Sequence, residues 1–285
     1  MLQQTRVAAV IEHYHEFLRR FPTVEKLAAA REASVLAEWS GLGYYRRARM
    51  MHAAAKTMVR EYAGRFPASE AGLRTLPGIG RYTAAAIASI AYDEPVAVVD
   101  GNVERVLRRT SGRQWDGEIL WSAANSLLET KRPGDFNQAM MELGAVVCTP
   151  RAPQCLTCPV VEICATRGEL ASTAKAPSQK KREIHYGLSV RGGDREDQEI
   201  FLVRRDLDAS LMPGMWELPE STILNEDNSS AFSLRHSITV TNYTVRVWLD
   251  VPTTGIAGKW IRAERLKTVA LTGLARKILQ KAEIL

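Results

Sequence analysis

The first half of the chain places apolar residues at the three- and four-residue spacing of α-helices. This spacing holds from Val7 to about Leu143, and turns containing proline or glycine interrupt it at 21–23, 41–43, 66–67, 77–80 and 132–135. The opening stripe consists of Val7, Val10, Ile11, Tyr14, Phe17 and Leu18. We therefore predict a bundle of short helices, with most of this stripe in its core.

The second half of the chain changes to short runs typical of β-strands, at 187–190, 199–204, 238–240 and 244–249, before a final helical stretch at 271–282. Between the halves, residues 170–184 are small, polar or basic, which is typical of an exposed linker. We predict an α+β protein of two domains, a helical domain at 1–169 and a mixed domain at 185–285.

Charge and targeting signals narrow the class of partner. The formal net charge of +6 favours an anionic partner such as nucleic acid, although proteins that bind no polyanion also carry such an excess. No apolar run approaches the ~20 residues of a membrane span, and the first residues lack a signal-peptide pattern. We expect a cytoplasmic protein with no membrane partner.

The cysteines form one cluster with the spacing C-x6-C-x2-C-x5-C. Because this spacing wraps a compact loop around one object, it argues against disulfides and for a metal centre. Four thiolates suit either a zinc ion or a four-iron cluster. The predicted ligands are Cys148, Cys155, Cys158 and Cys164.

A glycine-rich turn, L-P-G-I-G at 76–80, precedes an apolar helix at 84–91. Gly78 and Gly80 leave backbone N–H groups bare at a helix N-terminus, where a phosphate can approach closely. A plain helix–helix turn explains the same residues. The turn therefore makes DNA-backbone binding a hypothesis.

Asp100 follows an apolar run in V-V-D-G-N-V and opens the next predicted helix. The common role of such a residue is an N-cap, which satisfies orphan backbone N–H groups. An ionised carboxylate there can also stabilise positive charge in a reaction, and the two roles are compatible.

Together with M-L-Q-Q-T at 1–5 and G-L-G-Y-Y-R-R-A-R at 41–49, these motifs resemble the MutY adenine DNA glycosylases of the helix-hairpin-helix, endonuclease III-like superfamily. The resemblance implies that Asp100 faces the sugar of a flipped nucleotide and stabilises its oxocarbenium-like charge. Tyr82 stands where strand-cutting relatives have a lysine, which implies a monofunctional enzyme that forms no Schiff base.

The same resemblance assigns DNA contacts. Gln4 and Tyr44 would wedge into the base stack, and nearby arginines would meet phosphate. Taken alone, Tyr44 is better explained as a surface-anchored core aromatic, but the G-x-G-Y-Y loop followed by three arginines favours stacking. It also implies a [4Fe-4S] cluster on the cysteine loop 148–164, beside which Arg151 and Arg167 are either phosphate contacts or solvated side chains. The expected DNA-contacting set is Gln4, Tyr44, Arg46, Arg49, Gly78, Gly80 and Asn102.

The second domain resembles the Nudix-like domain at the C-terminus of MutY through F-L-V-R-R at 201–205 and L-M-P-G-M-W-E-L-P at 211–219. The magnesium-binding run of Nudix hydrolases does not follow, so phosphohydrolysis is not expected. The resemblance implies recognition of 8-oxoguanine, for which Ser237 and Thr239 are the candidates.

The resemblance also implies that the general acid, a glutamate, lies upstream of Met1, so we expect an N-terminally shortened chain. The predicted activity is hydrolysis of the N-glycosidic bond of adenine mispaired with 8-oxoguanine or guanine, in a monomeric, nucleoid-associated bacterial protein. Two alternatives stay open. One is a mismatch-binding protein with impaired catalysis, and the other is a glycosylase of different specificity, such as thymine removal from G·T.

Overall fold

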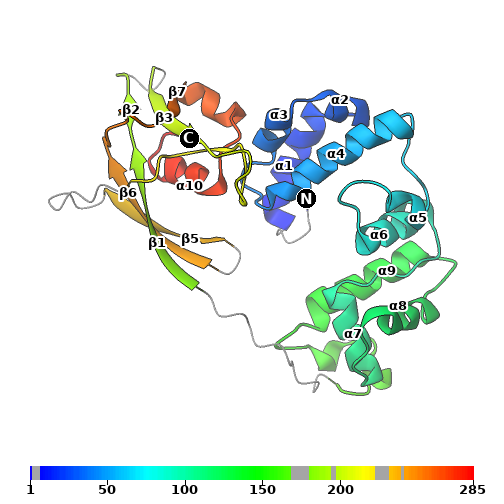
Figure 1. Cartoon of the computed structure of the whole chain (residues 1–285). Helices are drawn as coiled ribbons and strands as arrows, with labels where there is room; N and C mark the ends of the chain where they lie inside the picture. Colours follow the sequence, from blue (N-terminus) through cyan, green and yellow to red (C-terminus); the bar gives the residue numbers. More distant parts are fainter. Residues whose placement is uncertain (2–6, 168–179, 194–196, 222–230, 239–240) are drawn as a thin grey trace. The chain divides into compact units, whose positions relative to one another are not determined.

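The computed structural model of the 285-residue chain describes residues 1, 7–167, 180–193, 197–221, 231–238 and 241–285 (Figure 1). Two of the predicted site residues, Gln4 and Thr239, lie outside the described residues, as does the rest of the M-L-Q-Q-T motif after Met1. Helices occupy the first part of the chain and strands the second, which confirms the predicted α+β class.

The helical part begins with a run of four helices and ends in tight turns around the cysteines. The α-helices are α1 (Val7–Arg20), α2 (Val24–Ala29), α3 (Glu32–Glu38), α4 (Tyr45–Glu61), α5 (Glu70–Leu73), α6 (Arg81–Tyr92), α7 (Gly101–Ser111), α8 (Gly117–Ser126) and α9 (Pro133–Glu142). A π-helix, η1 (Leu143–Val147), continues α9. Two 3-10 helices, η2 (Cys155–Thr157) and η3 (Val161–Ile163), follow.

The β-rich part contains two sheets and a final helix. In one sheet β1 (Lys180–Leu188) pairs in parallel with β6 (Thr241–Leu249), which pairs antiparallel with β5 (Phe232–Ile238). In the other, β3 (Glu199–Arg204) pairs antiparallel with β2 (Val190–Arg191), β4 (Trp216–Glu217) and β7 (Gly258–Arg262). A 3-10 helix, η4 (Ala263–Thr268), and α10 (Gly273–Lys281) close the chain.

The chain divides into two compact units, one of which combines two separate parts of the sequence. One unit contains residues 1–56 and 176–285, and the other contains 57–175. The first unit joins distant parts of the chain because Met215 and Ala270 pack into the apolar cluster of α1–α4. Arg49 adds a hydrogen bond to the carbonyl of Pro213. The domain boundaries inferred from the sequence stay a prediction.

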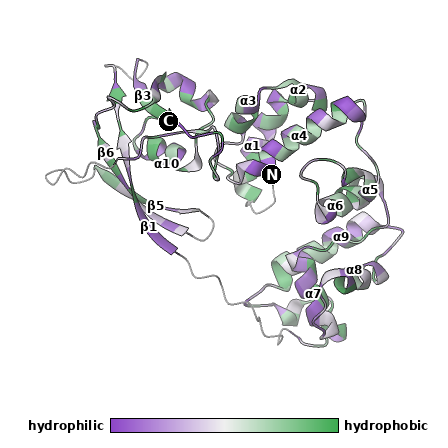
Figure 2. Ribbon diagram, viewed as in Figure 1, coloured by the Kyte–Doolittle hydropathy of each residue, from purple (hydrophilic) through white to green (hydrophobic). Residues whose placement is uncertain are grey.

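Two sequence inferences are wrong in detail. The stripe on α1 is not mostly core: Val10 and Phe17 are buried, but Val7, Ile11, Tyr14 and Leu18 are exposed, because the buried seam is narrower than the apolar face. Residues 180–184 are not linker either, since they begin β1. Figure 2 shows β1 changing from hydrophilic at its start to hydrophobic at its end, as an edge strand tolerates.

None of the helices in the described part of the chain is long and apolar enough to cross a membrane.

Candidate functional site

Asp100 is held rigidly at the start of α7. As predicted from its sequence context, it is the N-cap: one carboxylate oxygen, Oδ1, accepts hydrogen bonds from the backbone N–H groups of Asn102 (2.9 Å) and Val103 (2.8 Å). The other oxygen, Oδ2, accepts from the side-chain amide of Asn102 at 3.2 Å. The carboxylate is half-buried, so it is fixed in orientation but still accessible.

The extended segment that leads into Asp100 is fixed by two asparagines that sequence reasoning missed. The buried Asn137 accepts from the Val98 N–H at 3.0 Å and donates to the Val96 carbonyl at 2.9 Å. Asn125 accepts from the Ala97 N–H at 3.0 Å. These side chains supply the hydrogen bonds that a neighbouring strand would otherwise make to this backbone. They therefore fix the segment that carries the Asp100 carboxylate, although the segment belongs to no sheet.

Tyr82, on α6, is near enough to Asp100 for the two groups to influence each other. Partial burial raises the pKa of the Tyr82 hydroxyl, and the negative charge of Asp100 raises that pKa further. The hydroxyl contacts the Met141 sulfur at 3.8 Å. Both effects favour the protonated hydroxyl, which can donate a hydrogen bond.

Arg105 links Asp100 to the cysteine loop, a connection that the sequence analysis did not find. Its guanidinium donates to the Asn102 amide oxygen (2.7 Å), to the Gly144 carbonyl (2.7 Å) and to the Cys148 carbonyl (2.7 Å). Since Asn102 in turn holds Asp100, one chain of hydrogen bonds runs from a predicted metal ligand to the carboxylate. Asn102 thus contacts both Asp100 and Arg105, and its DNA contact stays a prediction.

Gly144 lets η1 lie directly against the start of α7. A Cβ at this position would be 2.6 Å from the Cβ of Asn102, closer than any packed atoms tolerate. We predict that Gly144→Ala lowers the free energy of unfolding by about 1–3 kcal/mol and slows the base removal that the sequence resemblance implies, because Asn102 must move and release Asp100. Chemical denaturation and a single-turnover assay measure the two effects.

Gly193→Ala is the matched control, because a Cβ there meets nothing within 4 Å. It should change neither the free energy of unfolding nor the rate. Equal behaviour of the two variants would show that the contact between η1 and α7 carries no constraint.

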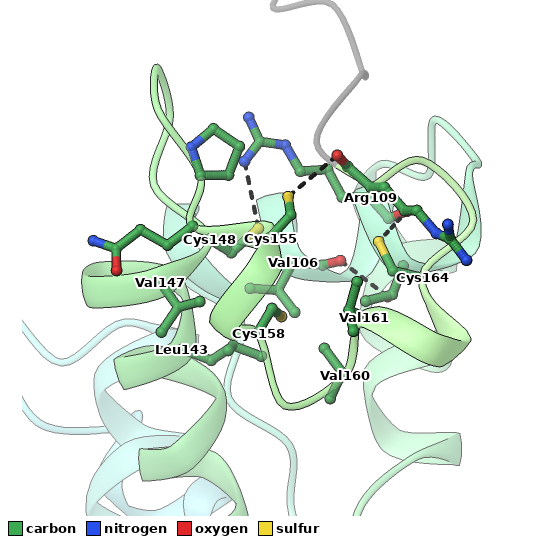
Figure 3. A pocket seen from close by; sticks show the side chains of 14 residues that line it. Val106, Arg109, Leu143, Val147, Cys148, Cys155, Cys158, Val160, Val161 and Cys164 are labelled. Carbon is green, nitrogen blue, oxygen red and sulfur yellow. Dashed lines mark hydrogen bonds between the residues drawn. The ribbon is translucent and has the colours of Figure 1, made fainter.

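The four cysteines line one pocket with apolar walls, shown in Figure 3. It has a volume of about 370 Å³ and opens to solvent. In the described residues, no three His, Cys, Asp or Glu side chains lie close enough to hold a single ion. Four thiols spread around one cavity suit a four-iron cluster, in which each iron takes its own thiolate. The donor set therefore fits that group, with Cys148, Cys155, Cys158 and Cys164 as its holders.

Arg109 is a second arginine of α7 that the sequence analysis missed. It is buried, 5% exposed, and donates to the Cys148 sulfur (3.4 Å) and to the carbonyls of Thr149 (2.8 Å) and Pro150 (3.0 Å). Its own backbone carbonyl accepts from the Cys164 thiol at 3.5 Å. Arg109 thus contacts both ends of the cysteine loop.

The turn before α6 has the exposed backbone that the sequence suggested. Gly78 has φ +77°, which favours glycine, and both Gly78 and Gly80 are exposed. No side chain caps the N-terminus of α6 at Gly80. Its N–H groups can therefore meet an anion from solvent.

The remaining predicted DNA contacts lie in the other unit. Tyr44 is 52% exposed with φ +48°, and Arg46 is exposed. Arg49 contacts Glu32 at 2.9 Å and the Pro213 carbonyl, and its phosphate contact stays a prediction. Ser237 donates to the Asn242 side chain at 2.6 Å on the β5–β6 hairpin.

A family model matches the first part of the chain. Residues 1–126 match the HhH-GPD superfamily of base excision DNA repair proteins. The matching stretch runs from the start of the chain to the end of α8 and includes Asp100.

Within the HhH-GPD superfamily, the similar curated proteins are adenine DNA glycosylases, which confirms the resemblance inferred from the motifs. The mouse enzyme is 46% identical over 62% of this chain and 37% of its own length. The Schizosaccharomyces pombe enzyme is 32% identical over 77% of this chain and 58% of its own length. The Arabidopsis thaliana enzyme is 38% identical over 84% of this chain and 44% of its own length. The chain thus spans roughly two to three fifths of the length of these relatives.

Two solved structures share the helical fold. A thermostable thymine-DNA glycosylase has a TM-score of 0.55 and 27% identity, covering 58% of this chain and 79% of that one. A trapped endonuclease III–DNA covalent intermediate has a TM-score of 0.53 and 25% identity over the same shares.

Proposed function

We propose that this protein is a monofunctional adenine DNA glycosylase of base excision repair that removes adenine mispaired with 8-oxoguanine or guanine. The observation that carries the proposal is the carboxylate of Asp100, oriented by three hydrogen bonds, half-exposed and close to Tyr82. The adenine DNA glycosylases among its relatives support the choice of base.

In the proposed reaction the adenosine nucleotide leaves the duplex and its sugar faces Asp100. As the C1′–N9 bond breaks, the bonding electron pair leaves with adenine, and the ionised carboxylate stabilises the positive sugar until water adds to it. Tyr82 offers a hydrogen-bonding hydroxyl but no amine, so no Schiff base forms and the strand stays uncut. In the family pattern described above, a glutamate acts as general acid and protonates adenine, so that adenine leaves as a neutral base.

The DNA backbone would bind at the turn of Gly78 and Gly80, where exposed N–H groups begin α6. Tyr44, with Arg46 nearby in the sequence, would meet the base stack. The proposed wedge partner Gln4 lies outside the described residues.

A [4Fe-4S] cluster held by the four cysteines would supply a rigid crosslink of their loop when bound. This chain's own residues then transmit that rigidity, because Arg105 ties the Cys148 carbonyl to Asn102 and so to Asp100. The exposed Arg151 and Arg167 are available to DNA phosphates.

For the β-rich part we propose a Nudix-like domain that recognises 8-oxoguanine, with Ser237 as a contact and Thr239, outside the described residues, as another. The proposed domains are 1–169 and 185–285. We propose that the protein acts as a monomer in the cytoplasm.

The test is a glycosylase assay on duplexes with A·8-oxoguanine, A·G and G·T mispairs, using this chain and the chain extended by its in-frame upstream codons. We expect adenine release from A·8-oxoguanine by the extended chain, with the strand intact until alkali is added. Binding without release by both chains would favour the mismatch-binding alternative. Thymine release would favour the specificity of the structurally similar thymine-DNA glycosylase.

A further inference from the structure

The loop that carries Tyr44 has a backbone conformation that is costly on its own. Gly41, Gly43 and Tyr44 have φ values of +108°, +68° and +48°. A left-handed conformation at a bulky residue costs about 1 kcal/mol or more, so surrounding contacts must maintain it. Because Tyr44 is half-exposed, its ring is not what holds the loop in place.

Residues from the C-terminal part of the same compact unit fix both ends of this loop. The carbonyl of Leu271 accepts the hydroxyl of Ser40 at 3.1 Å and the hydroxyl of Tyr45 at 3.2 Å. Arg276, on α10, donates to the Ser40 hydroxyl at 2.9 Å. Ser40 is the residue before the loop and Tyr45 the residue after it. Both are buried, so these hydrogen bonds are shielded from water.

The anchoring carbonyl is itself firmly held. The Leu271 side chain is fully buried in the core formed by the two sheets and α10. Its backbone N–H donates to Val269, and an isolated bridge joins it to Trp216 of β4. The loop is thereby attached to the core of the β-rich part rather than to its surface.

Residues of the helical part contact the middle of the loop. The indole of Trp39 donates to the Gly43 carbonyl at 3.0 Å. Arg47 reaches the same carbonyl at 3.4 Å, and its guanidinium lies 5.1 Å from the centre of the Tyr44 ring. The helical side also holds the backbone of Ser40, whose carbonyl lies 3.0 Å from the His13 ring and whose N–H donates to Ala37. The contacts from the C-terminal part are instead with the side chains of Ser40 and Tyr45, at the two ends of the loop.

We propose that the β-rich part of the chain positions Tyr44 for its contact with DNA, through the Leu271 carbonyl and Arg276 acting on Ser40 and Tyr45. The proposal rests on the DNA role given to Tyr44 under the proposed function. Arg276, Ser40 and Tyr45 are positioning residues. The part of the chain assigned to 8-oxoguanine recognition then also sets the geometry of the loop that probes the base stack.

The first experiment needs no DNA. The double variant Ser40→Ala/Tyr45→Phe removes both donors to the Leu271 carbonyl but keeps the side-chain volumes nearly unchanged. We expect amide hydrogen exchange across residues 41–44 to accelerate about tenfold or more in the extended chain, because each net hydrogen bond contributes a factor of about 2–10. Tyr14→Phe, on an exposed α1 tyrosine, is the matched control and should change nothing. Unchanged exchange in the double variant would overturn the proposal.

The second experiment separates this proposal from the role of Tyr44 itself. A 2-aminopurine placed beside the mispaired guanine reports stacking by its fluorescence. Tyr44→Ala should abolish the protein-induced change, and Arg276→Gln, a milder variant that should leave the fold intact, should reduce it at least threefold. No effect of Tyr44→Ala would reject its DNA role. An effect of Tyr44→Ala without one from Arg276→Gln or the double variant would reject the positioning by the β-rich part.

Discussion

Asp100→Asn is expected to slow adenine release by about 10³-fold, the size of effect found when a single charge-stabilising group is removed from an active site. The reason is that a neutral amide cannot balance the positive sugar. Binding to the mismatched duplex should change less than about threefold, since asparagine is also a good N-cap and can still accept from the N–H groups of Asn102 and Val103. Single-turnover rates and equilibrium binding, both with the extended chain, measure these quantities.

The control for this prediction is Asp116→Asn. Asp116 is also an N-cap aspartate, at the start of α8, but its side chain makes no capping hydrogen bond. Its variant should cleave at the normal rate. If Asp100→Asn cleaved as fast as this control, Asp100 would be a cap alone and the proposed mechanism would fail.

Cys148→Ser is expected to remove the cluster and weaken the fold of its surroundings. Purified protein should contain about four iron atoms per chain and absorb visible light, and the variant should lose most of both. The melting temperature should also fall, because the pocket walls and the Arg105 and Arg109 contacts meet at this cysteine. Elemental analysis, absorbance and thermal unfolding provide the measurements. A colourless protein that contains one zinc ion per chain would reject the iron-sulfur cluster and support the zinc alternative.

Arg109→Met tests the same centre without touching a ligand. The described partners of this buried guanidinium are the Cys148 sulfur and two carbonyls, so an anionic thiolate centre is the natural balance for its charge. Methionine should lower the iron content and shift the reduction potential of any cluster retained to more negative values. Arg113→Met, on an arginine stacked on Trp115, serves as the comparison. If both variants had the same iron content and the same reduction potential, Arg109 would have no part in holding the cluster.

The sequence predicted the elements whose signal is local. Asp100 was identified because an N-cap is defined by its immediate neighbours, and the cysteines because their spacing is characteristic. Arg105 and Arg109 escaped because their partners, Cys148 to Pro150, lie about 40 positions further along the chain. No periodicity records such a pairing, although both arginines lie on one face of α7 together with Asn102.

Contacts between distant segments also explain what the sequence did not predict. The contacts of Arg49 with Glu32 and with the Pro213 carbonyl have no local signal, and its phosphate contact stays a prediction. The charged start of β1 was taken for linker because its pairing with β6 depends on residues that follow much later. The short strands β4 and β7 were missed for the same reason, since their pairing with β3 is what defines them.

The π-helix before Cys148 requires a fixed number of residues between α9 and this cysteine. Such a turn contains one residue more than the α-helical path around the same axis. Deleting any residue of 143–147 would let α9 run on regularly and rotate everything beyond it by about 100°. The Cys148 carbonyl would then turn away from Arg105, while conservative replacements of the valines would preserve the phase. Insertions and deletions in this stretch should therefore be tolerated far less than substitutions.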